Sequence, residues 1–205
     1  VINNGINLRK LTEIKTQLTG EAETKKELGF LPEDKIILNI ARLKPQKNHR
    51  LLVESFKKFR EHHKNYKLVI LGIGSEMENL KTLVKDLNLS EDVFIMGYRS
   101  DVQKFYSISE IFVLTSEREG FPNVLLEALA FGVPIVTTRV GGVEEIIREG
   151  RNGFVVAADP ESIVEKMEII SKNPAYFKKF CEDTAKEFDI NKIVEKYEDL
   201  FNSLT

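Results

Sequence analysis

Short apolar runs alternate with amphipathic segments along most of this chain. Six mainly apolar runs have the length of strands and occupy residues 36–40, 68–71, 93–96, 111–114, 135–138 and 154–156. Because hydrophobicity is continuous within most of these runs instead of alternating, the strands are predicted to be covered on both faces, as parallel strands are. Their alternation with helical segments predicts an α/β fold built on a doubly wound, parallel, six-stranded sheet.

The segments between these runs have the periodicity of helices. Residues 48–61 place apolar side chains on one stripe and basic side chains on the opposite face. Further helices are predicted over residues 76–87, 122–131, 162–171, 174–188 and 191–201. Asp159 followed by Pro160 is typical of a helix start just after the last strand. Residues 8–28 are polar with scattered leucines, and the pattern does not say how they pack.

The composition of the chain limits the cellular compartments and the classes of binding partner that are expected. A chain of 205 residues with 42% hydrophobic content can bury one full core, and a formal net charge of -2 gives no reason to expect nucleic acid as a partner. Cys181 is the only cysteine, which excludes an intrachain disulfide and favours a reducing compartment. No run approaches the ~20 apolar residues of a membrane helix, and no signal peptide is evident, so a cytoplasmic location is expected. The sequence begins at Val1, as if in mid-strand, and we therefore expect the chain to be a fragment.

Two carboxylates eight positions apart, Glu119 and Glu127, lie on either side of an expected strand-to-helix turn. The apolar run 111–114 precedes them, Gly120 allows a sharp turn, and Pro122 suits the first turn of a helix. In a doubly wound sheet, ligands bind in the crevice outside the carboxyl ends of the strands. Since an ionised carboxylate only accepts hydrogen bonds, this pair is suited to hydroxyl pairs such as those of sugars and ribose.

Two cations follow the first strand in the connection of residues 41–48. Arg42 and Lys47 are predicted to lie at the carboxyl edge of the sheet, beside the free N–H groups of the next helix. Such a group of donors can hold a diphosphate, because Arg grips two phosphate oxygens and Lys acts as a mobile charge. Taken alone, a basic pair in a loop is usually just solvated. The hypothesis therefore depends on the neighbouring turns.

Glycine pairs end two of the predicted strands. Gly72 and Gly74 follow the second strand, and Gly141 and Gly142 follow the fifth. A missing Cβ lets a ligand approach the backbone, although each pair taken singly is ordinary turn chemistry. The first pair begins like a dinucleotide fingerprint, but Met77 stands where the third glycine belongs, which argues against NAD. The chain also lacks a Gly-Lys-Ser/Thr phosphate loop and a Gly-x-Ser-x-Gly nucleophile elbow.

Five motifs follow one another along the chain. They are Arg42 with Lys47-Asn48, Gly72-Ile73-Gly74, Glu119-Gly120-Phe121-Pro122 with Glu127, Gly132-Val133-Pro134-Ile135-Val136, and Gly141-Gly142. In this order they resemble the C-terminal, donor-binding domain of the retaining glycosyltransferases of family 4, the glycosyl transferases group 1. The resemblance extends from residues 1–7, which are similar to the family's interdomain segment, to about Glu165.

The resemblance implies one half of a GT-B architecture, in which two Rossmann-like domains face each other. Residues 1–205 would form a single Rossmann-like donor-binding domain. Within it, residues 1–30 would supply the interdomain segment and linker helices, and residues 159–205 the C-terminal helices. In this family the last helix often crosses back to the partner domain, whereas we expect residues 191–201 to pack on this same domain.

The resemblance also assigns roles to matching positions. Arg42 and Lys47 would hold the diphosphate of a nucleotide sugar and stabilise its growing charge, and Glu119 would bond the hydroxyls of the donor sugar. Glu127 would accept both ribose hydroxyls. The predicted catalytic residues are thus Glu119, Arg42 and Lys47, and the predicted donor-binding residues are Gly72, Gly74, Tyr98, Arg99, Gly120, Phe121, Pro122, Asn123 and Glu127.

No metal ion or other cofactor is expected, because the sequence has no Asp-x-Asp motif and the family uses cationic side chains instead. The nucleotide-diphosphate sugar is the substrate and the predicted partner. Tyr98 and Arg99 follow the third strand and are similar to the segment that contacts the nucleobase. The Tyr98 side chain either stacks on the nucleobase or simply packs on the protein surface, and the sequence does not distinguish these two roles.

Parts of the family pattern are absent from this chain. Glu145 is the better match to the acid after the second glycine pair, and its role stays open. The family's N-terminal acceptor domain and its catalytic histidine are missing, and His49, His62 and His63 do not match that histidine and are expected to be solvated. The polypeptide alone is therefore expected to bind the donor but to transfer sugar poorly. Peripheral membrane association is left open for the intact enzyme only.

Two other interpretations remain beside a metal-independent, retaining transferase. One is a non-catalytic binding module that keeps the fold, which clustered charges at one sheet edge disfavour. The other is an epimerase domain that binds phosphosugars, which would need a base of its own. The sequence does not identify the nucleobase, the sugar or the acceptor.

Overall fold

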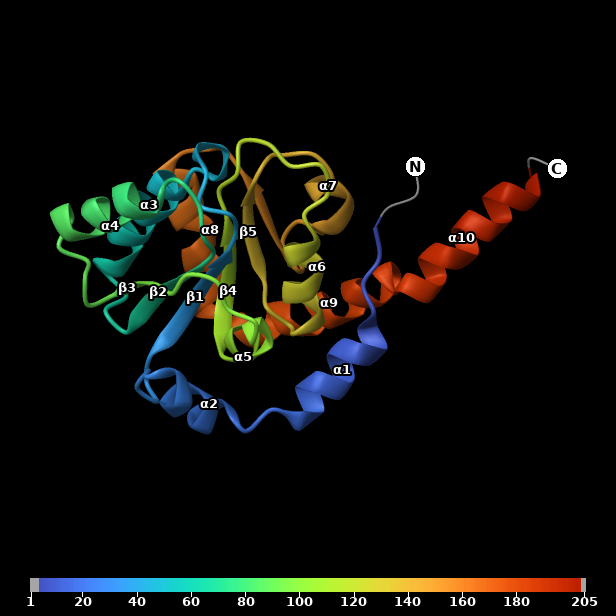
Figure 1. Cartoon of the computed structure of the whole chain (residues 1–205), viewed down its shortest axis with the longest axis horizontal. Coiled ribbons are helices and arrows are strands. Elements are labelled where there is room, and N and C mark those ends of the chain that lie inside the picture. Colours follow the sequence, from blue (N-terminus) through green and yellow to red (C-terminus); the bar gives the residue numbers. More distant parts are fainter. Residues whose placement is uncertain (1–3, 204–205) are drawn as a thin grey trace.

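A single parallel sheet organises the computed structural model, which describes residues 4–203 (Figure 1). Its strands are β1 (Lys35–Ile40), β2 (Tyr66–Leu71), β3 (Val93–Ile95), β4 (Ser109–Leu114), β5 (Ile135–Thr138) and β6 (Gly153–Val156). All five neighbouring pairs are parallel, and the order across the sheet is β3-β2-β1-β4-β5-β6. The six predicted strands and the doubly wound, Rossmann-like α/β fold are therefore confirmed.

Helices precede the sheet, cover it and follow it. They are α1 (Leu8–Gln17), α2 (Glu21–Leu28), α3 (His49–Arg60), α4 (Met77–Asp86), α5 (Val102–Ser107), α6 (Asn123–Ala130), α7 (Val143–Ile146), α8 (Pro160–Lys172), α9 (Pro174–Ala185) and α10 (Ile190–Ser203). Short 3-10 turns span Pro45–Lys47 and Lys186–Phe188. Helices α5 and α7 were not predicted, because six and four residues are too few for a helical period to show.

Each face of the sheet carries its own apolar core. The side chains of Ile36 and Leu38 pack with residues of α5, α6 and α7, whereas Ile37 of the same strand packs with residues of α3, α4 and α8. Figure 1 shows these helices on the two sides of the strands. Alternate residues of β1 thus feed opposite layers, and both are buried. Two-sided burial is why the strand sequences are continuous apolar runs.

The last helix does not follow the sequence-based expectation. Helix α10 projects away from the sheet (Figure 1), and only its Ile193 is buried. Large apolar side chains further along it are 43–64% exposed, namely Val194, Tyr197, Leu200 and Phe201. The prediction that this helix packs on the same domain is therefore wrong beyond its first turn.

The first described residues run beside the start of α10. Ile6 N–H donates to Phe188 O (2.9 Å), and Ile190 N–H donates to Ile6 O (2.9 Å). A Cβ at Gly5 would lie 2.9 Å from Ile193 Cγ1, so glycine allows this close approach. Val1, Ile2 and Asn3 of the predicted interdomain segment lie outside the described residues. Within residues 4–203, no helix combines the length and apolar character that crossing a bilayer requires.

Candidate active site at the switch point of the sheet

The centre of the sheet contains a topological switch point. Strands β1 and β4 are neighbours, yet the helices that follow them, α3 and α6, belong to opposite apolar layers. In doubly wound sheets, the crevice at the carboxyl edge of such a switch point is where ligands bind. One loop carries Arg42 and Lys47, and the other carries Glu119.

Hydrogen bonds tie these two loops together. Thr115 Oγ1 lies 3.1 Å from Lys47 O and 3.0 Å from Asn48 O. Glu117 N–H donates to Gln46 O (2.8 Å), and Asn48 Nδ2 donates to Glu117 Oε1 (3.3 Å). Residues 46–48 and residues 115–117, which are about 70 positions apart in the sequence, are thus held side by side. The position of Lys47 relative to the acidic loop follows from this bonding.

Lys47 and Glu119 form an ion pair in the crevice. Lys47 Nζ bonds Glu119 Oε1, and the Ser116 hydroxyl donates to the same oxygen over 2.7 Å. The two charged side chains are only 14% and 15% exposed. The structure therefore brings together Lys47, which is predicted to bind the diphosphate, and Glu119, which is predicted to bind the sugar. In the free protein the charges of the two side chains neutralise each other. Glu119 Oε2 remains for a further donor.

Arg42 is exposed on the loop, and the turn after β2 supports that loop. Leu43 N–H donates to Ile73 O (2.9 Å), and a Cβ at Gly72 would lie 1.9 Å from Ala41 O. A Cβ at Gly74 would lie 2.1 Å from Leu43 O. The position of a Cβ at each of these glycines is therefore taken by the protein backbone, and packing of the two loops alone requires glycine at both positions. Backbone contact of Gly72 and Gly74 with a donor stays a prediction.

The second glycine pair supports the acidic loop in the same way. A Cβ at Gly141 would lie 2.6 Å from Glu119 O, and one at Gly142, where φ is +73°, would lie 2.9 Å from Gly120 O. In contrast, a Cβ at Gly120 would meet nothing within 4 Å among the described residues. The open side of the acidic loop is thus at Gly120.

The turn that follows begins α6. Phe121 packs on Phe188 with ring centroids 6.1 Å apart, and Pro122 occupies the N-cap position. Asn123 is the first helical residue, one position later than predicted, and its Oδ1 accepts a hydrogen bond from Asn4 Nδ2 (3.2 Å). Leu125 N–H donates to Pro122 O (3.0 Å), and because Pro122 has no side-chain acceptor, the N–H groups of Asn123 and Val124 have no partner among the described residues.

Glu127 lies on α6 and is mostly buried. Burial raises the pKa of this carboxyl, and a hydrogen bond with Tyr106 partly opposes the rise. Tyr106 Oη lies 3.1 Å from Glu127 Oε2. Sequence reasoning missed Tyr106, because in the printed sequence it is one aromatic residue in a short amphipathic segment.

The loop after β3 presents one free aromatic side chain. Tyr98 is 76% exposed, whereas Arg99 makes a bidentate pair with Asp101 at 2.8 and 2.7 Å. That pair raises the pKa of Arg99 and lowers the pKa of Asp101. Ile73, which was not predicted, is 59% exposed at the end of the adjacent strand β2. Tyr98 and Ile73 are therefore available for stacking, while the guanidinium of Arg99 is already paired.

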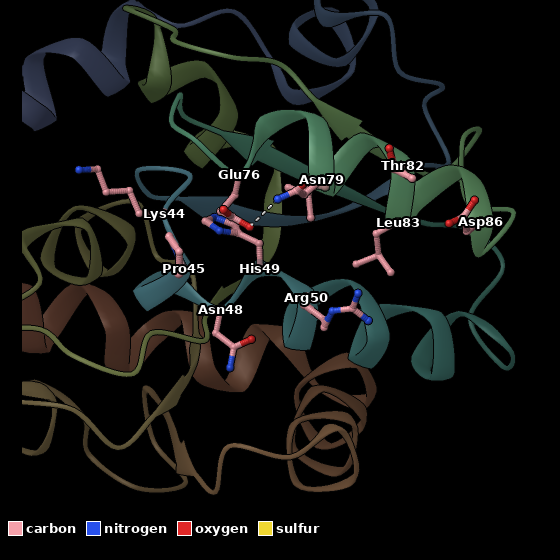
Figure 2. A pocket seen from close by; sticks show the side chains of 11 residues that line it. Lys44, Pro45, Asn48, His49, Arg50, Glu76, Asn79, Thr82, Leu83 and Asp86 are labelled. Atoms are coloured by element: carbon pink, nitrogen blue, oxygen red, sulfur yellow. Dashed lines mark hydrogen bonds between the residues drawn. The ribbon is translucent and has the colours of Figure 1, made fainter.

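His49 is not solvated, contrary to the expectation. It is 4% exposed, and burial together with the charge of Lys47 lowers its pKa to about 4. It lines a cavity of about 400 Å³ between α3 and α4 (Figure 2), where Asn79 Nδ2 donates to Glu76 Oε2 over 3.2 Å. His62 is exposed as predicted, and His63 stacks on Phe59 with centroids 4.1 Å apart.

Comparison with known proteins assigns the chain to a family. The family model described as glycosyl transferases group 1 matches residues 20–188. The chain belongs to this family. One curated relative is the N-acetyl-alpha-D-glucosaminyl L-malate synthase of Bacillus anthracis, which is 32% identical to this glycosyl transferases group 1 chain over 186 residues. The match covers 87% of this chain and 48% of the relative. The chain thus spans about half the length of the first curated relatives that it matches.

Solved structures agree on the fold of this glycosyl transferases group 1 chain. A glycosyltransferase from Rickettsia africae has a TM-score of 0.89 at 24% identity, covering 99% of this chain and 56% of that one. The Anabaena protein HepE, solved in complex with UDP and glucose, has a TM-score of 0.86 at 21% identity, covering 99% and 56%. The fold and the match to one domain of a GT-B glycosyltransferase are therefore established. Within residues 4–203, no three His, Cys, Asp or Glu side chains are grouped as metal ligands, and independence from metal stays a prediction.

Proposed function

We propose that this domain binds a nucleotide-diphosphate sugar for a retaining, metal-independent transfer that the whole protein carries out on an acceptor hydroxyl. The observation that carries the proposal is the Lys47–Glu119 ion pair at the switch point, with Arg42 exposed on the same loop. In the bound state the diphosphate takes Lys47 and Arg42. Glu119 stays held by Ser116 and turns its Oε2 toward the hydroxyls of the sugar.

The proposed catalytic contribution is electrostatic. Negative charge grows on the leaving diphosphate in the transition state, and Arg42 and Lys47 are positioned to stabilise it. The N–H groups of Asn123 and Val124 at the start of α6, close in sequence to the open Gly120, would add oriented dipoles to the same region. Because Lys47 is only 14% exposed, its charge acts in a medium that screens it less than bulk water does.

The proposed nucleobase platform is the pair of exposed side chains Ile73 and Tyr98. They lie in the loops that follow the adjacent strands β2 and β3, and Gly72 N–H donates to Gly97 O (2.8 Å) between these loops. An aromatic face and an aliphatic face can together cover a flat base. Uracil is the base we propose, since HepE was solved with UDP.

Calorimetric titration with uridine, guanosine and adenosine diphosphates tests this function. We expect UDP to bind at least about tenfold more tightly than the other two, as a gain of about 1.4 kcal/mol for the matching base would give. Tyr98→Ala should weaken UDP binding because it removes the proposed stacking face. Failure of all three nucleotides to bind would contradict the proposal and favour the non-catalytic module.

Binding of the ribose should depend on pH through Glu127. The ionised carboxylate accepts from both ribose hydroxyls, whereas the protonated form has lost an acceptor. Because the pKa of Glu127 is raised, protonation begins at a higher pH than for an ordinary glutamate. The preference for UDP over its 2′-deoxy analogue should therefore be largest where Glu127 is ionised and decrease as the pH falls, and the decrease should begin at a higher pH than for an ordinary glutamate. Fluorescence titration at a series of pH values measures this preference. In Glu127→Gln the preference for UDP should be low and independent of pH. If the preference in that variant depended on pH as it does in the wild type, the proposed role of Glu127 would be refuted.

A further inference from the structure

Tyr106 of α5 directs its hydroxyl at the proposed ribose-binding residue. Its side chain is 1% exposed, and its ring stacks on Phe112 and Phe131 with centroids 6.0 and 5.6 Å apart. The hydroxyl lies 3.1 Å from Glu127 Oε2 and 3.2 Å from Val124 O. The packed ring therefore holds the oxygen in one place between two acceptors.

One proton must serve both acceptors. A tyrosine hydroxyl carries a single hydrogen, while the carbonyl of Val124 and an ionised Glu127 can only accept. The bond to the carboxylate is charge-assisted and is the stronger of the two. Burial and the nearby Glu127 hold the pKa of Tyr106 well above its usual value, so the hydroxyl keeps its proton. When Glu127 is ionised, Tyr106 is thus the donor to Glu127 Oε2.

The fixed bond decides which part of Glu127 is free. With Oε2 engaged from the α5 side, rotation of the carboxylate is restricted, and Oε1 accepts no hydrogen bond from the described residues. Without this donor, a mostly buried carboxylate would be less well solvated and free to rotate. A diol needs two acceptor directions at defined angles, and a fixed carboxylate supplies them without further ordering.

We propose that Tyr106 is a positioning residue that orients the Glu127 carboxylate for a ribose diol and so sets the preference for ribonucleotides over deoxyribonucleotides. The inference rests on the proposed function of Glu127. Tyr106 itself is too deeply buried to touch the ligand. Its effect is confined to the sugar of the nucleotide and leaves the diphosphate contacts of Arg42 and Lys47 in place.

Tyr106→Phe is the direct test, because it removes one oxygen and keeps the stacked ring. Dissociation constants for UDP and 2′-deoxy-UDP should show the wild-type preference for UDP reduced about tenfold, with the affinity for 2′-deoxy-UDP almost unchanged. A preference equal to that of the wild type overturns the inference. Should Tyr106→Phe not fold, 3-fluorotyrosine at position 106 offers a stronger donor, and a preference below that of the wild type would then overturn it.

The chain contains a matched control at the other end of the sheet. Tyr66 Oη donates to Glu110 Oε2 over 2.7 Å, and both residues lie near the amino ends of their strands. Tyr66→Phe also removes a partly buried tyrosine–glutamate bond, so it should lower the midpoint of thermal unfolding without changing the preference for UDP. Equal loss of preference in both variants would indicate a general structural effect and overturn the role of Tyr106.

Glu127→Gln separates the role proposed for Glu127 from the role proposed for Tyr106. If this variant and Tyr106→Phe both keep the full preference for UDP, the proposed role of Glu127 is wrong and the role of Tyr106 falls with it. If Glu127→Gln loses the preference and Tyr106→Phe keeps it, the proposed function survives and only the inference on Tyr106 is overturned.

Discussion

Lys47→Ala is expected to weaken UDP binding by about 10- to 150-fold, since losing a charge-assisted contact costs about 1.5–3 kcal/mol. The loss should exceed that of Arg42→Ala, because the alanine also leaves Glu119 buried without its cation. An unpaired carboxylate at the mouth of the crevice repels a diphosphate as well as failing to attract it. Calorimetric titration of both variants measures the difference.

Two further variants make this result specific. Lys47→Ala combined with Glu119→Gln removes the unpaired charge, so UDP affinity should recover part of the loss. Lys44→Ala changes an exposed lysine of the same loop and should bind UDP as the wild type does. Wild-type affinity in both Arg42→Ala and Lys47→Ala would show that the diphosphate is held elsewhere.

Gly72→Ala is expected to reduce the free energy of unfolding by about 3 kcal/mol or more, which is large for a single methyl group. Its Cβ would lie 1.9 Å from Ala41 O, and its φ of +151° lies in a region that favours glycine. Gly74→Ala should be destabilising for steric reasons alone, since its Cβ would lie 2.1 Å from Leu43 O. Relief requires the Arg42 loop to move, so UDP binding should fall in both variants. Urea denaturation gives the free energies.

Gly120→Ala is the matched control for this steric effect. Its Cβ would meet nothing within 4 Å among the described residues, so the free energy of unfolding should change by less than about 1 kcal/mol. A wild-type stability in Gly72→Ala, or an equal loss in Gly120→Ala, would contradict the assigned cause. If a donor lies against the open side of the acidic loop, Gly120→Ala should bind UDP more weakly while staying folded.

Sequence and structure agree best where burial is two-sided. Strands such as β1 and β4 are recognisable in the sequence because both of their faces pack against apolar layers, so that consecutive residues are apolar. Short helices were missed because α5 and α7 contain fewer than two turns. His49 was misjudged because its burial depends on tertiary structure, where it shares a cavity with residues of α4, and nothing in its own local sequence reveals this.

The sequence by itself determined the parallel sheet, its flanking helices and the family signature, because local hydrophobic period and ordered motifs need no knowledge of distant contacts. Only the tertiary structure decided which of those motif residues meet. Lys47 pairs with Glu119 across 72 positions, Tyr106 donates to Glu127 across 21, and the projecting helix α10 leaves its apolar stripe exposed. The tertiary structure also distinguishes glycines that look alike in the sequence. The backbone of residue 41 occupies the Cβ position of Gly72, whereas no described residue occupies that of Gly120. Such contacts depend on how separate loops converge at the switch point, which chain order does not encode locally.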